Sequence, residues 1–127
     1  MIDSVSTVCI FVNDQDRAKK FYTEKLGFEV RGDFPMRGDA RWLAVAPPGA
    51  HTEVILYKFS PEWENYASVI GKAQALTFNV TDMAALHADL KAKGVRITQE
   101  PEVQPWGNFM TILDEDDNGL ILVEQPT

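Results

Sequence analysis

The sequence predicts an α+β fold made of two half-size modules of one design, and three observations support this. A Val-x-Asp turn leading into a helical run occurs twice, with Asp14 and Asp82 lying 68 positions apart. Each helical run ends at a glycine, Gly27 in the first copy and Gly94 in the second. Alternating apolar segments follow at 42–45 and 109–112, at a separation of 67 positions. Self-similarity at a nearly fixed period indicates an internal repeat.

The first module reads as strand, helix and three strands. Residues 4–12 alternate with period two, which is typical of a strand. Asp14 then caps a helix, because its carboxylate accepts backbone N–H groups of the first turn. The apolar stripe on this helix consists of Ala18, Phe21, Tyr22 and Leu26. Gly27 ends the helix, and three strands are predicted over 28–34, 41–46 and 52–59.

A connecting segment interrupts the repeat. Ser60-Pro61 resembles a helix start with proline in the first turn, and Gly71 ends it. We therefore predict a short connecting helix over about 60–72, with Trp63 as its anchor.

The second module repeats the order. A strand over 76–80 leads to a helix capped by Asp82 and ended by Gly94. The remaining predicted segments are a strand at 95–98, a polar loop at 100–105, a strand at 108–113, an acidic turn at 114–119 and a last strand at 120–124. The whole chain, 1–127, is predicted to be one domain, with modules at about 4–59 and 73–125.

Composition narrows the class of partner. The net charge is −7 and the pI about 4.7, so phosphate backbones are repelled and no nucleic-acid partner is expected. A cationic or neutral small ligand fits better. Cys9 is the only cysteine, which precludes an intrachain disulfide and favours a reducing compartment. No signal-peptide pattern or apolar run of membrane-helix length is present, so we predict a cytoplasmic protein with no membrane partner.

Three motifs carry a resemblance to a known family: Val12-Asn13-Asp14 followed by the segment 20–28 (KFYTEKLGF), then Pro105-Trp106-Gly107, and the acidic turn 114–118. The chain resembles the vicinal oxygen chelate superfamily, which contains glyoxalase I, the bleomycin-resistance proteins and the extradiol dioxygenases. This resemblance implies paired βαβββ modules that form a curved mixed sheet around a cleft, with helices on the outer face. It also implies a homodimer. It does not imply one reaction, because the fold supports many.

Enzymes of this family hold a divalent metal with His and Glu side chains from four strands. The resemblance places three of the ligand positions at Thr7, Ala75 and Ile121. Threonine is a weak ligand, and alanine and isoleucine have no donor atom to offer. We therefore expect no metal and no other cofactor, although a divalent metal remains the family's alternative.

Glu53 is the one acidic candidate for the cleft. At an offset of 67, Ile121 matches Val54. Alternation nevertheless groups Val54 with Leu56 on one face and places Glu53 and Tyr57 on the other. A one-residue difference in the preceding turn reconciles the two counts, because such a slip moves every side chain to the other face. Glu53 is thus a candidate catalytic residue, and an edge glutamate is the alternative.

The other reactive side chains point to structural roles. His51 and His87 match no ligand position and lack the spacing of metal ligands. Cys9 falls on the cleft set of the first strand, but no base or cation lies near it in sequence to lower its pKa. We therefore interpret Cys9 as a small buried hydrophobic side chain, with a nucleophile as the alternative. Arg41 reads as a surface arginine, with Glu53 or an anionic ligand as alternative partners.

Aromatic residues provide the remaining signal. Trp42, Tyr57, Trp106 and Phe109 fall on or near strands that border the predicted cleft, where aromatic walls stack on flat or cationic ligands. Core or dimer packing is the alternative for each, and Trp106 is the strongest candidate. The predicted ligand-binding residues are Thr7, Cys9, Trp42, Glu53, Tyr57 and Trp106.

Three functions follow. The first is a metal-free protein that binds a small molecule in an apolar, aromatic cleft without turnover, similar to the bleomycin-resistance branch. The second is a metal-dependent lyase, isomerase or dioxygenase that uses Glu53 as base or partial ligand. The third is a structural or regulatory dimer whose own side chains fill the cleft.

Overall fold

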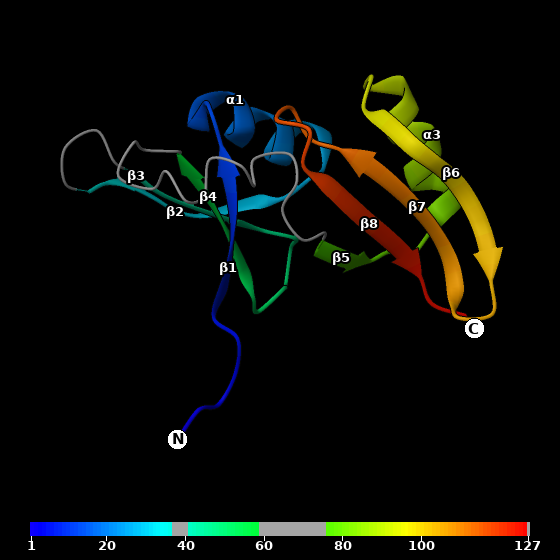
Figure 1. Ribbon diagram of the computed structural model, residues 1–127, viewed down its shortest axis with the longest axis horizontal. Helices are drawn as coiled ribbons and strands as arrows, with labels where there is room; N and C mark the ends of the chain where they lie inside the picture. Colours follow the sequence, from blue (N-terminus) through cyan, green and yellow to red (C-terminus); the bar gives the residue numbers. More distant parts are fainter. Residues whose placement is uncertain (37–40, 59–75, 127) are drawn as a thin grey trace. The chain divides into compact units, whose positions relative to one another are not determined.

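The computed structural model describes residues 1–36, 41–58 and 76–126 (Figure 1). The predicted connecting helix at 60–72, its Trp63 and the ligand position Ala75 lie outside the described residues. The chain divides into two compact units, unit 1 (Met1–Ile70) and unit 2 (Gly71–Thr127), and each is described by itself.

Unit 1 has the predicted order of strand, helix and three strands. Its four strands form one sheet in the order β1-β4-β3-β2, with β1 parallel to β4 and the other neighbours antiparallel. The elements are β1 Thr7–Val12, α1 Gln15–Lys20, η1 Phe21–Lys25, β2 Glu29–Pro35, β3 Arg41–Ala46 and β4 Glu53–Lys58.

Unit 2 repeats this arrangement, which confirms the α+β fold predicted from the internal repeat. Its sheet has the order β5-β8-β7-β6, again with one parallel pair, β5 and β8. The elements are β5 Leu76–Asn79, α3 Met83–Ala92, β6 Arg96–Gln104, β7 Gly107–Leu113 and β8 Gly119–Glu124.

Both helices start at the predicted caps. The Asp14 carboxylate accepts a hydrogen bond from Arg17 N at 3.0 Å, and Asp82 accepts one from Ala85 N at 3.1 Å. The first helix then changes to π-type hydrogen bonding in η1, where Leu26 N donates to Phe21 O. The spacing of apolar residues did not predict the change from α-type to π-type hydrogen bonding, because the apolar side chains stay on one side of the helix in both. No helix in the described part of the chain is long and apolar enough to cross a bilayer.

One face of each sheet packs against its own helix. In unit 1, the buried strand residues on this face alternate along the chain: Ile10, Val12, Leu43, Val45, Val54 and Leu56. They meet Ala18, Phe21 and Tyr22 of the helix. In unit 2, Met110, Ile112, Leu120 and Leu122 meet Met83 and Leu90 of α3. Each sheet therefore has a second face that points away from its helix, called here the open face.

The predicted loop at 100–105 is wrong, because β6 runs through Gln104. The strand is last in the sheet order, so one side of its backbone has no strand partner among residues 76–126. Proline is tolerated on such an edge, and Pro101 lies within a register shift between Gln99 and Glu102. Polar composition and proline thus indicated a loop where the structure has an irregular edge strand.

Candidate functional site

The open face of unit 1 collects most of the predicted site residues. In the parallel pairing of β1 with β4, Thr7 is opposite Glu53, Cys9 is opposite Ile55 and Phe11 is opposite Tyr57. Paired residues share a face, and Ile55 is as buried as Val54, so the partners on β1 distinguish the two faces. Ile10, opposite Leu56, is buried, whereas Cys9, opposite Ile55, is exposed. The alternation predicted for β4 is therefore confirmed, and it places Glu53 and Tyr57 on the open face.

Aromatic rings cover much of this face. The Phe11 and Tyr57 rings lie 6.4 Å apart, centroid to centroid, and are tilted by 51°. Trp42 lies on β3 next to Gly32, where an added Cβ atom would come within 3.4 Å of Trp42 Cδ1. The same added atom would lie 3.4 Å from a ring carbon of Phe34, which is 54% exposed. The absence of a side chain at Gly32 leaves room for both rings, so four aromatic side chains, Phe11, Phe34, Trp42 and Tyr57, belong to the open face of unit 1.

Glu53 lies at the end of this face beside Arg31. Its carboxylate is 3.9 Å from Arg31 Nη1, while Arg31 Nε donates to Glu29 at 2.7 Å. The alternative pairing of Glu53 with Arg41 is wrong, since Arg41 binds other carboxylates. The sheet holds Glu53 on the open face but gives it only a long ion pair with the described residues.

The repeat aligns with an offset of 66 in the last strand of each unit. Cys9 pairs with Ile55, and the repeat equivalent Thr77 pairs with Ile121. Ile121 therefore matches Ile55, and the match to Val54 is wrong. The predicted one-residue difference in the turn is confirmed. Glu53 corresponds to Gly119, so it lies two residues before the position that matches Ile121.

The open face of unit 2 combines aromatic and hydroxyl groups. The Trp106 and Phe109 rings lie 5.0 Å apart with an interplanar angle of 37°, and Trp106 is 52% exposed. Phe109 shares its face of β7 with Thr111, whose Oγ1 lies 2.7 Å from Thr98 Oγ1. Sequence reasoning missed this hydroxyl pair. The signal was Thr111 standing at the repeat position where unit 1 has Ala44.

Cys9 is exposed on the open face of unit 1, yet its surroundings make it a poor nucleophile. Neighbouring groups remove part of its water, and this partial burial raises the pKa of the thiol to about 11. The thiolate is the reactive form, so Cys9 is protonated and unreactive near neutral pH. The interpretation of Cys9 as a buried hydrophobic side chain is wrong, because Cys9 is exposed at this position of β1.

The residues at the family's ligand positions do not fit a metal. Thr7 and Ile121 supply no strong donor, and no group of three or more His, Cys, Asp or Glu residues in the described ranges is arranged to hold an ion. His51 is exposed in the turn before β4. His87 on α3 pairs with Glu100 of β6, outside the open face.

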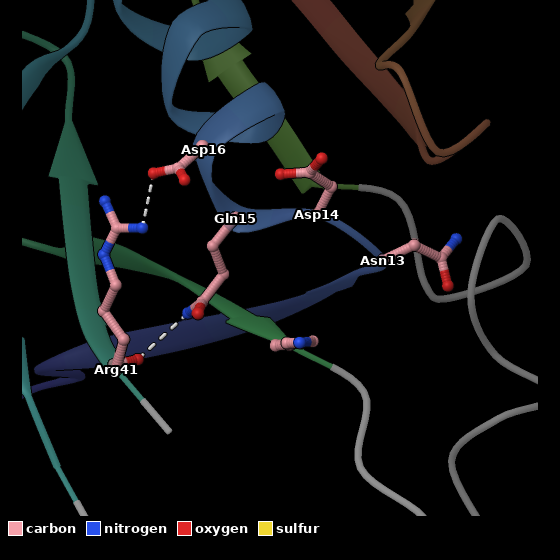
Figure 2. A pocket seen from close by; sticks show the side chains of 6 residues that line it. Asn13, Asp14, Gln15, Asp16 and Arg41 are labelled. Carbon is pink, nitrogen blue, oxygen red and sulfur yellow. Dashed lines mark hydrogen bonds and ion pairs between the residues drawn. The ribbon is translucent and has the colours of Figure 1, made fainter. Parts of the chain in front are cut away.

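A separate polar pocket of about 380 Å³ lies at the start of α1 (Figure 2). Its lining residues are Asn13, Asp14, Gln15, Asp16, Arg41 and Lys58. Buried Gln15 donates from Nε2 to the Arg41 and Leu56 carbonyls at 2.9 and 2.8 Å, tying α1 to β3 and β4. These bonds give Gln15 a structural role.

Arg41 forms ion pairs with carboxylates around this pocket. It binds Asp16 at 2.6 Å and both oxygens of Asp33, and Lys19 binds Asp33 as well (Figure 2 shows the Asp16 pair). Hydrogen bonds from Arg41 and Lys19 hold the pKa of the Asp33 carboxyl well below its usual range. The hydrogen bonds that Arg41 donates to Asp33 and Asp16 raise the pKa of the Arg41 guanidinium. Arg41 and Asp16 at the pocket are thus paired with each other, and Arg41 also binds Asp33. We favour the open faces as the functional site.

Comparisons with known proteins agree with this geometry. Residues 3–122 match the family model of the Glyoxalase/Bleomycin resistance protein/Dioxygenase superfamily. YetH of Bacillus subtilis (strain 168) is 39% identical over 98% of this chain and 100% of its own length.

Solved structures extend the comparison. TnmS3, an antibiotic binding protein from Streptomyces sp. CB03234, is 33% identical with a TM-score of 0.86, over 98% of both chains. A glyoxalase/bleomycin resistance protein from the same organism is 33% identical with a TM-score of 0.80, over 95% of this chain and 100% of that one. The chain therefore belongs to the Glyoxalase/Bleomycin resistance protein/Dioxygenase superfamily.

Proposed function

We propose that this protein binds a small organic molecule on an aromatic open face of a unit and holds it without a metal and without turnover. The observation that carries this proposal is the pairing of aromatic rings on the open face of each unit, Phe11 with Tyr57 and Trp106 with Phe109. Stacking of such rings on a flat ligand contributes favourably to the free energy of binding. The similarity to an antibiotic binding protein supports the same class of function.

The six residues predicted to bind the ligand have different parts in this proposal. On the open face of unit 1, Trp42 and Tyr57 supply ring surface, and Thr7 and Cys9 supply small side chains on the same face. On the open face of unit 2, Trp106 supplies ring surface. Glu53 supplies a carboxylate for a cationic or hydroxyl group. The net charge of −7 favours neutral or cationic molecules over anions.

Trp106→Ala is expected to weaken ligand binding by about tenfold or more, because it removes one ring of the Trp106–Phe109 pair. The measurement is isothermal titration with bleomycin and with the planar cationic dye proflavine. Val103→Ala is the matched control, since Val103 is 80% exposed near the same hairpin but alternates to the other face. Equal affinities of the wild type and Trp106→Ala for every probe that binds would overturn the role of Trp106.

A metal-dependent lyase, isomerase or dioxygenase is the second candidate, and the observation that favours it is Glu53 on the open face opposite Thr7. Its test is elemental analysis with a thermal-shift panel of Mn²⁺, Ni²⁺, Zn²⁺ and Fe²⁺. Specific binding stabilises the folded state by mass action, so the metal-free proposal expects no shift in Tm. One bound metal per chain, with a shift lost in Glu53→Gln, would replace the first proposal with this one.

The resemblance supports two further parts of the proposal, a homodimer and a cytoplasmic location. Exposed Phe34 and Trp106 are apolar surface of the kind that interfaces cover. Sedimentation velocity tests the dimer, and a monomer at micromolar concentration would contradict it. The single cysteine is the support for a reducing compartment, which fractionation of the source cells would test.

A further inference from the structure

We infer that unit 2 recognises an oxygen substituent on the aromatic ring of its ligand by hydrogen bonding. The groups that bind this oxygen are the hydroxyls of Thr98 and Thr111, which adjoin the Trp106 and Phe109 rings. The inference rests on the proposed function and names the class of ligand more closely. That class is a neutral fused-ring molecule carrying a hydroxyl or carbonyl oxygen.

The strand register places both pairs on one face. Phe109 and Thr111 are two residues apart on β7, about 7 Å along the strand, so their side chains share the open face. Thr111 is opposite Ile121, and Phe109 is opposite Val123. A flat molecule stacked on Trp106 and Phe109 and extending along β7 therefore brings its far edge to Thr111.

The hydroxyl pair keeps hydrogen-bonding capacity for a ligand. The two Oγ1 atoms are 2.7 Å apart, and either can be the donor. One proton is used within the pair, so the accepting threonine still has its own O–H to donate. Both oxygens also keep lone pairs. Because the donor can switch, the pair can bind either a carbonyl or a hydroxyl group.

The pair is not needed to build this sheet. Unit 1 forms the same strand pairing, with a register shift at the same place, but has Ala44 where unit 2 has Thr111 and Arg31 where unit 2 has Thr98. Two side chains without hydroxyls thus occupy these positions in the same backbone geometry. The two threonines therefore add hydrogen-bonding groups to a sheet whose strands pair equally well without them.

The charges around the pair favour a neutral ligand group. Thr77 and Ile121, which lie in register with Thr111, are both uncharged. The nearest ionisable residues along β6 are Arg96 and Glu100, each two residues from Thr98, and Glu100 binds His87 of α3. Arg96 already binds Asp117 and the Asp114 carbonyl. No cation beside the pair in the described ranges is therefore free to select an anionic oxygen.

The test compares 2-naphthol with 2-methylnaphthalene, which differ by a hydroxyl in place of a methyl group. Binding is followed by NMR on the Trp106 indole N–H, assigned with Trp106→Phe. The wild type is expected to bind 2-naphthol about 3- to 10-fold more tightly, as one net hydrogen bond allows. In the Thr98→Val/Thr111→Val double variant this ratio is expected to fall to about one, with the affinity for 2-methylnaphthalene unchanged.

The control is Thr81→Val, which removes an exposed hydroxyl outside the sheet and should keep the wild-type ratio. A ratio that persists in the double variant, or a wild-type ratio of one, would overturn the hydroxyl recognition while leaving aromatic binding intact. Failure of both molecules to perturb Trp106 would overturn the inference together with the proposed role of this face. An unchanged Tm of the double variant shows that the fold is preserved.

Discussion

Gly107→Ala is expected to lower the free energy of unfolding by about 2–4 kcal/mol, since two costs combine at this residue. Gly107 has a φ of +144°, a backbone conformation that L side chains rarely adopt. An added Cβ would also lie 2.8 Å from the Glu124 carbonyl oxygen and 3.0 Å from Val123 Cγ1. The carbonyl belongs to β8, so the strand itself would have to move. Urea denaturation followed by circular dichroism measures the change.

Gly119→Ala is the matched control for this substitution. Gly119 also lies in the sheet of unit 2, but no heavy atom is within 4 Å of its added Cβ. We expect a change within about 0.5–1 kcal/mol, of either sign, because only chain entropy and local preference differ. Equal destabilisation by both substitutions would show that the close approach of Gly107 to β8 does not matter. Gly107→Ala should also weaken ligand binding, because it displaces the hairpin that carries Trp106.

Asp114→Ala is expected to destabilise the protein by a similar amount, about 2–4 kcal/mol. The Asp114 side chain is 1% exposed, and its Oδ1 accepts hydrogen bonds from Asp116 N at 2.8 Å and Asn118 N at 2.9 Å. Its Oδ2 accepts a third from Asn118 Nδ2 at 2.9 Å. Alanine removes the acceptor and leaves these buried N–H donors without a hydrogen bond. Each such donor then bears the free-energy cost of having been removed from water. The measurement is again urea denaturation.

Asp117→Asn controls for the charge lost from the same turn. Asp117 has a φ of +65°, which asparagine tolerates well, and its ion pair with Arg96 is exposed. Exposed pairs contribute little, so we expect a loss below about 1 kcal/mol. If this variant were as unstable as Asp114→Ala, the ion pair between Asp117 and Arg96 would stabilise the turn as much as the buried Asp114 carboxylate does. Asp114→Asn should fall between the two, because its amide oxygen keeps the Oδ1 acceptor role.

The sequence by itself determined the repeated architecture. Asp14 and Asp82 mark the helix starts, and period-two alternation marks the strands, because capping and amphipathic burial depend on residues close together in the chain. The same local logic placed Glu53 and Tyr57 on one face of β4. It also identified Trp106 as an aromatic residue beside a glycine, which the structure places against Phe109.

Only the tertiary structure showed which side chains from different strands and helices contact one another. The Thr98–Thr111 pair, the pairing of Glu53 with Arg31 and the hydrogen bonds of Gln15 join residues 13 to 41 positions apart. No local pattern encodes such partners, because they depend on register and on bulges that shift it. The extension of β6 through Pro101 has the same origin, since an edge strand accepts a proline that a central strand would exclude.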